Sequence, residues 1–131
     1  MRLLLDTHIW LWSILNPERL SRRVTKLLNT STNEVWISPV SIWELSILAR
    51  KGRVNLKMDV NEWVTRVLQS TPLQEATFTN AVALDMNKIR LAHDDPADAF
   101  IAATASVFEL TLVTADEKLL ALKHISTMAN D

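Results

Sequence analysis

Four carboxylates at widely separated positions are the residues of this sequence best suited to carry out chemistry: Asp6, Glu44, Asp98 and Asp116. The chain has no Cys and a single Gly. These two facts exclude thiolate zinc sites, cysteine nucleophiles and the glycine-rich loops that bind phosphates or dinucleotides. Any reaction must therefore use carboxylates, hydroxyls, imidazoles or basic groups.

Carboxylates that meet in one site raise each other's pKa, and a divalent cation relieves their repulsion. A ligand set made of oxygen alone favours Mg²⁺ or Mn²⁺. A metal of this kind activates water and stabilises the charge that develops during phosphodiester hydrolysis. The four acids therefore predict metal-dependent phosphodiester chemistry, provided that the fold brings them together.

Short β-like runs alternate with helical patterns along the 131 residues, which predicts an α/β fold with a central parallel sheet. The apolar runs around Leu4 and Leu112 are continuous, as in strands that helices cover on both faces. The predicted strands are residues 2–5, 34–37, 111–113 and, more weakly, 124–128. Helices are predicted near Thr7 and over residues 18–29, 40–51, 60–70, 77–89 and 97–108, with a short one ending at Leu122. No repeat or flexible linker interrupts residues 1–131, which predicts a single domain.

Capping signals mark several of these helices. Ser38 and Asp95 each precede a Pro, the pattern of an N-cap followed by the first helical residue. Thr114 with Glu117 fits a capping box. Gly52 stands where the helix over residues 40–51 should end in a left-handed residue. The single Gly therefore has a structural interpretation.

Ligands of parallel α/β sheets gather at the carboxyl ends of the strands. Asp6 directly follows the first strand, and Asp116 lies shortly after the strand that ends at Val113. Asp98 lies in the first turn of the preceding helix. Each of these residues also has a purely structural alternative. Asp6 and Asp116 could serve as helix caps and nothing more, and Asp98 could serve merely to complement a helix dipole.

Glu44 interrupts an apolar stripe formed by Val40, Ile47 and Leu48 on one helix face. An ionised Glu that faces the interior needs a partner or a metal. A structural salt bridge is the alternative to a catalytic role.

Four blocks of the sequence closely resemble the PIN-domain ribonucleases and, more narrowly, the VapC-type toxins of VapBC toxin–antitoxin pairs. They occur in the order of that family, have its spacing and span nearly the whole chain. The blocks are Leu4-Leu5-Asp6-Thr7-His8, residues 38–44 (SPVSIWE), residues 93–103 (HDDPADAFIAA) and Leu112-Val113-Thr114-Ala115-Asp116.

The resemblance implies a three-layer α/β/α fold and an Mg²⁺- or Mn²⁺-dependent endoribonuclease that a cognate antitoxin neutralises. Asp6 and Asp98 would coordinate metal, Glu44 and Asp116 would hold metal or position water, and Thr114 would be a supporting hydroxyl. The resemblance also implies a homodimer. Two departures remove positive charge near the site, since Ala99 stands where the family often has Arg and Asp94 stands where it has a basic or neutral residue. Asp95 is interpreted mainly as a helix cap.

The formal net charge of −1 argues against a strongly basic nucleic-acid-binding protein. Binding of two divalent ions would change this charge to about +3 and reverse the local field. Basic residues at 19, 22, 23 and 26, and again at 50, 51, 53 and 57, are either solvated faces or an RNA backbone track.

The five Trp residues are expected mainly in the core or at interfaces, with base stacking as the less common use. The helix with Trp10 and Trp12 could form part of a groove for an antitoxin helix. His8, His93 and His124 are assigned to no metal. The chain has no long apolar segment, which predicts a soluble, cytoplasmic protein.

Two alternatives to the endoribonuclease stay open from the sequence. One is a metal-dependent phosphoesterase that acts on DNA. The other is a non-catalytic binding module with the same fold, which predicts no metal binding.

Overall fold

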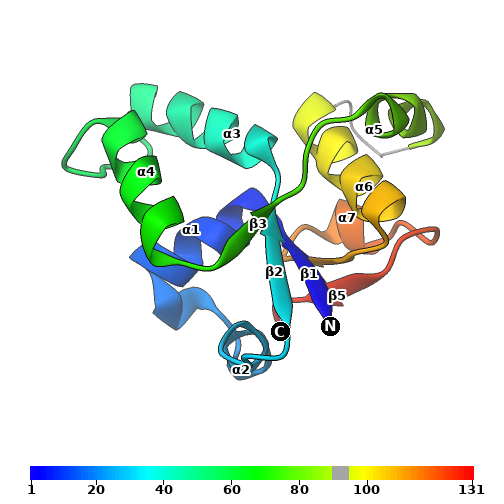
Figure 1. The fold of residues 1–131 in the computed structure, drawn as a ribbon, viewed down its shortest axis with the longest axis horizontal. Helices are drawn as coiled ribbons and strands as arrows, with labels where there is room; N and C mark the ends of the chain where they lie inside the picture. The colour runs from blue at the N-terminus through cyan, green and yellow to red at the C-terminus, as the bar shows by residue number, and fades with distance from the viewer. Residues whose placement is uncertain (90–94) are drawn as a thin grey trace.

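A computed structural model describes residues 1–89 and 95–131 of the chain. In this part, one all-parallel sheet has the strand order β3-β2-β1-β4-β5 (Figure 1). The strands are β1 (Arg2–Leu5), β2 (Glu34–Ile37), β3 (Leu73–Glu75), β4 (Thr111–Thr114) and β5 (Thr127–Ala129). The predicted α/β fold with a central parallel sheet is therefore confirmed.

Strand β3 was not predicted from the sequence. It has three residues, lies at the sheet edge beside β2 and alternates little in polarity. The last strand begins at Thr127, three residues later than the weak prediction of 124–128. Short edge strands carry too few residues for a clear period-two pattern.

Seven α-helices lie between and around the strands of the described chain. They are α1 (Thr7–Leu15), α2 (Arg22–Leu28), α3 (Pro39–Arg50), α4 (Val60–Ser70), α5 (Asn80–Asp85), α6 (Pro96–Phe108) and α7 (Glu117–Leu120), with 3₁₀ turns η1 (Pro17–Arg19) and η2 (Met86–Lys88). The predicted N-caps of α3 and α6 are confirmed: Ser38 Oγ accepts from the Val40 N–H at 3.1 Å, and Asp95 Oδ1 accepts from the Ala97 N–H at 3.0 Å. Gly52 has a φ of 70° just after α3, as its interpretation requires.

Three helix predictions were wrong in detail. The predicted helix 18–29 is η1 followed by α2, because the Ser21 hydroxyl caps a new start by accepting from the Val24 N–H. The predicted helix 77–89 is α5 followed by η2, with Thr79 as the N-cap. The last short helix ends at Leu120, and its N-cap is Asp116 rather than Thr114. In the first two cases the capping residue lies inside the predicted segment, so the α-helix begins later than predicted.

Two apolar clusters lie on the opposite faces of the sheet, which gives the predicted three layers. Leu3 and Leu5 point to the cluster that contains Trp10, Leu45 and Trp63, together with α1, α3 and α4. Leu4 and Leu112 point to the other cluster, which α5, α6 and α7 complete. Figure 1 shows these two groups of helices on either side of the strands. Within the described ranges, no helix has the length and apolar character needed to span a bilayer.

Candidate active site

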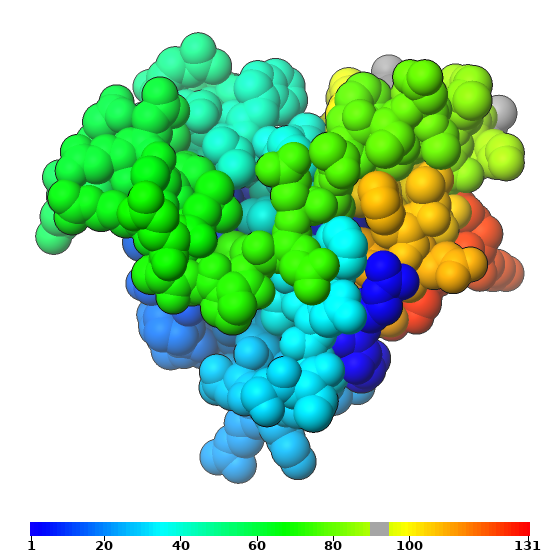
Figure 2. Space-filling view, in the orientation of Figure 1, coloured from blue at the N-terminus to red at the C-terminus, as the bar shows by residue number. Residues whose placement is uncertain are grey.

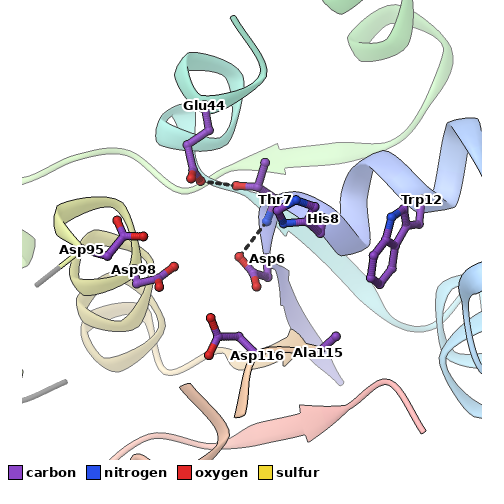
Figure 3. A pocket seen from close by; sticks show the side chains of 9 residues that line it. All are labelled: Asp6, Thr7, His8, Trp12, Glu44, Asp95, Asp98, Ala115 and Asp116. Atoms are coloured by element: carbon purple, nitrogen blue, oxygen red, sulfur yellow. Dashed lines mark hydrogen bonds between the residues drawn. The ribbon is translucent and has the colours of Figure 1, made fainter. Parts of the chain in front are cut away.

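A pocket of about 390 Å³ lies at the carboxyl ends of β1 and β4. All four predicted acids line it, although they come from four different elements. Figure 3 shows their side chains around one open space. The full lining is Asp6, Thr7, His8, Trp12, Glu44, Asp95, Asp98, Ala115 and Asp116.

Asp6 is the most firmly held of these acids. It follows β1, caps α1 and has an exposed fraction of 8%. Its Oδ1 accepts from the Thr7 N–H at 2.8 Å, and its Oδ2 accepts from the Thr114 hydroxyl at 2.7 Å. Burial raises the pKa of Asp6 above its usual value, and the charge of Asp116 raises it further, while the two hydrogen bonds oppose that shift. Capping and a place in the pocket are therefore not alternatives for this residue.

Thr114 links the two strand-end acids. Its hydroxyl donates to Asp6 and accepts from the Asp116 N–H at 3.0 Å. The side chain is fully buried at the end of β4. The hydroxyl therefore fixes the rotamer of Asp6 and the backbone that presents Asp116.

Glu44 finds a hydroxyl partner rather than a cation. The Thr7 hydroxyl donates to Glu44 Oε1, and Ser41 Oγ lies 2.8 Å from the same hydroxyl oxygen. Since a threonine hydroxyl has only one proton, Ser41 donates to Thr7 when Glu44 is ionised. No salt bridge to Glu44 occurs among residues 1–89 and 95–131. Partial burial raises the pKa of Glu44, and Asp6 and Asp95 add to this shift.

Thr7 and Ser41 were not predicted as site residues from the sequence. Both lie within blocks that resemble the family, and Ser41 stands one helical turn before Glu44, so this spacing could have suggested a contact. Hydroxyl residues next to acids are common at helix starts, however, and they offer no distinctive signal by themselves.

The opposite wall of the pocket comes from α6 and α7. Asp98 lies in the first turn of α6 and has an exposed fraction of 9%. Asp95 caps α6, as expected, and its side chain also lines the pocket. Asp116 Oδ1 accepts from the Lys118 N–H at 2.7 Å at the start of α7. His93, and Asp94 with its departure from the family pattern, lie outside the described residues.

The oxygen atoms of the carboxylates are suitable ligands for a hard divalent cation. The distances between the carboxylates limit how many of them could bind one ion. The lining supplies oxygen donors from Asp and Glu, and two of these acids have raised pKa values that a nearby cation would lower. In the described ranges, no three His, Asp or Glu side chains come close enough together to hold an ion by themselves. Mg²⁺ ordinarily uses one or two carboxylates and completes its shell with water and substrate phosphate, so the donor set fits that mode.

The aromatic residues of α1 have different environments. Trp10 has an exposed fraction of 1% and packs edge-on against Trp63 at 5.8 Å, so its ring belongs mainly to the core. Trp12 instead lines the pocket, and the Arg19 guanidinium lies 4.3 Å from its ring centroid. Arg23, from the same basic cluster, pairs with Asp131. A cationic side chain therefore packs on a ring that lines the pocket.

A three-layer α/β/α fold with a parallel sheet and acids at the strand ends defines a class of protein. Comparison with known proteins identifies that class. The chain matches the model of the PIN domain family over residues 3–125 and belongs to that family.

A similar curated protein is Ribonuclease VapC22 from Mycobacterium tuberculosis, which is 33% identical over 124 residues, or 92% of each chain. Among solved structures, the fold resembles VapBC2 from Rickettsia felis bound to a promoter DNA fragment, with a TM-score of 0.77 and 21% identity over all of both chains. It also resembles DNA-bound VapBC from Salmonella typhimurium, with a TM-score of 0.68 and 24% identity over 98% of both chains.

Proposed function

We propose that this protein is a metal-dependent endoribonuclease toxin of the VapC type. The observation that carries the proposal is the meeting of Asp6, Glu44, Asp98 and Asp116 around one pocket at the carboxyl ends of the parallel strands. The similarity to Ribonuclease VapC22 supports RNA as the substrate.

In this proposal, Asp6 and Asp98 coordinate Mg²⁺ or Mn²⁺ together with water and substrate phosphate, and Glu44 and Asp116 hold metal or position the attacking water. When bound, the metal supplies a nucleophile at neutral pH and stabilises negative charge on the phosphoryl and leaving oxygens. The chain's own hydroxyls do the positioning. Thr114 fixes Asp6, and Thr7 fixes Glu44 while its N–H holds the other oxygen of Asp6.

The proposed protein partner is a cognate antitoxin. Several proteins with this fold were solved as VapBC complexes, and another was solved as a toxin–antitoxin complex from Klebsiella pneumoniae. A homodimer and a cytoplasmic location stay predictions.

The test is an RNA cleavage assay on the purified chain without a partner. We expect cleavage with Mg²⁺ or Mn²⁺, none with EDTA, and none by Asp98→Asn. Unchanged cleavage by Asp98→Asn would overturn the assignment. A DNA substrate in the same assay tests the DNA phosphoesterase, and calorimetric titration with Mn²⁺ tests the non-catalytic module, which predicts no metal binding.

A further inference from the structure

Trp43 is a large aromatic side chain that is exposed rather than packed in the core. It lies on α3 directly before Glu44, and its exposed fraction is 56%. None of the ring pairs or cation–ring contacts in the described structure includes it. The core therefore does not account for its size and apolar character.

The surface around Trp43 continues directly from the carboxylate pocket. A cleft of about 240 Å³ has His8, Glu44 and Asp95 in common with that pocket, and Trp43, Pro96 and Ala97 complete much of its other side. A second hollow, of about 430 Å³, begins at the same Trp43, Pro96 and Ala97. Figure 2 shows the surface indented between α3 and the α5–α6 side. The three cavities therefore form one path, and Trp43 stands midway along it.

Aromatic rings line the far end of this path. Phe78 and Phe100 pack with their centroids 4.1 Å apart at an angle of 36°, and both line the second hollow with Trp43. Phe78 is itself exposed. Exposed rings in a row are the usual platform for the bases of a single strand, because every base has a π face.

We propose that Trp43 is a base-stacking residue for RNA, holding a nucleotide next to the phosphate in the carboxylate pocket. This inference rests on the proposed ribonuclease function and adds a subsite to it. The base lies on the Trp43 ring in the cleft, and the backbone passes the rim at Glu44 and Asp95. Recognition through the ring face predicts tolerance of sequence and a requirement for unpaired RNA.

The charge along α3 agrees with a nucleic-acid strand. Ile47 lines the cleft one turn after Trp43, and Arg50 and Lys51 follow one turn further on, both exposed. Neither basic residue has an ion pair within the part of the chain that is described. They are therefore available for phosphates beyond the stacked base.

A second copy of this chain is the competing occupant of the path. Because the cleft has three residues in common with the carboxylate pocket, a copy seated on Trp43 would also cover the pocket mouth. An RNA strand uses the pocket and the cleft together, which is why the structure favours it.

The experiment measures RNA binding to the Asp98→Asn protein, which retains the substrate uncleaved. Two fluorescein-labelled probes of equal length are titrated in Mn²⁺: an oligoadenylate and an abasic ribose-phosphate oligomer. We expect Trp43→Ala in this background to weaken oligoadenylate binding about ten-fold, the order found when a stacking ring is removed, and to leave the abasic oligomer unaffected. Trp43→Phe should restore most of the affinity. Leu84→Ala, at a residue of α5 that is 67% exposed, is the matched control and should bind both probes normally.

Several results would overturn the subsite. Equal weakening for both probes would show a loss unrelated to the base, and unchanged oligoadenylate binding would show no stacking. Light scattering that shows a dimer for the parent and a monomer for Trp43→Ala would assign the ring to an interface between copies. Cleavage by the wild-type chain separates this inference from the proposed function. RNA cleavage without a Trp43 effect would remove the subsite alone, whereas neither cleavage nor RNA binding would remove both.

Discussion

The carboxylate pocket and the aromatic path meet at Glu44 and Trp43, two adjacent residues of α3, yet they are built in opposite ways. In the pocket, hydrogen bonds hold the acids across large separations in sequence, as from Thr114 to Asp6 over 108 residues. In the path, Trp43 and Phe78 are exposed, and Phe78 packs against the half-buried Phe100.

The difference reflects what each region has to do. Carboxylates that position a metal and water must be fixed before substrate arrives, because misplacement lowers the rate steeply. A ring that stacks a base tolerates small movements. Preorganisation has a cost in the pocket, where burial and neighbouring acids raise the pKa of Asp6 and Glu44 and so destabilise their charged forms.

The largest effect is expected for Asp6→Asn. Loss of the buried carboxylate should lower kcat/KM for RNA by more than the roughly 10- to 100-fold that is typical when a residue supporting a metal ligand is lost. The matched variant is Asp85→Asn, in an acid of α5 outside the pocket, which should cleave normally. Cleavage of Asp6→Asn within a few-fold of wild type would show that the firmly held acid is structural only.

The same variant should be more stable than wild type in EDTA. The pKa of Asp6 in the folded state is raised above its usual 3.8. The wild-type protein therefore loses stability as the pH rises from this usual value through the folded-state pKa, whereas Asn does not titrate and the variant has no such loss. The gain should be absent below the usual value and should grow as the pH rises above it. Urea unfolding followed by Trp fluorescence at several pH values measures it. A gain independent of pH would contradict the electrostatic cause.

Thr114→Val should have the next largest effect. It removes the hydroxyl that holds Asp6 and accepts from the Asp116 N–H, and supporting contacts of this kind are worth about 10- to 100-fold in metal affinity. Calorimetric titration with Mn²⁺ measures the loss. Thr111→Val, at the other end of β4, removes a hydroxyl paired with Ser126 and is the control. Equal affinities for the two variants would mean that Asp6 needs no support from Thr114.

Much of this architecture was predictable from the sequence because strong local signals agree with the tertiary structure. The apolar runs of β1 and β4 and the Ser-Pro and Asp-Pro helix starts specify the elements that carry the four acids. The predicted boundaries were wrong where a polar residue inside the predicted segment caps the helix, as Ser21 and Thr79 do. At 114–117, Asp116 is the cap because its Oδ1 accepts from the Lys118 and Leu119 N–H groups, whereas the Thr114 hydroxyl accepts from the Asp116 N–H.

What could not be predicted depends on side-chain geometry between distant elements. No pattern in the sequence shows that Thr7 rather than a cation meets Glu44, or that Trp43 faces outward while Trp10 is buried. Both Trp residues lie on helices rich in apolar residues, and only the packing of α3 against α6 and of α1 against the sheet separates them.

The smallest effect is expected at Arg19, and it tests whether charge and stacking are divided between the two ends of the site. The Arg19 guanidinium lies over the ring of Trp12, which lines the pocket. Arg19 carries a positive charge, whereas Trp43 at the other end of the site is uncharged. If Arg19 contacts a phosphate, Arg19→Ala should weaken RNA binding only a few-fold but reduce the slope of log affinity against log salt by about 0.7. Arg19→Lys should keep the slope, because it keeps the charge.

Arg66→Ala, at an exposed α4 residue paired with Glu62, is the charge-matched control. Trp43→Ala should leave the slope unchanged, since stacking releases no counterions, and a slope that changed equally in the Arg19 and Trp43 variants would contradict that division of roles.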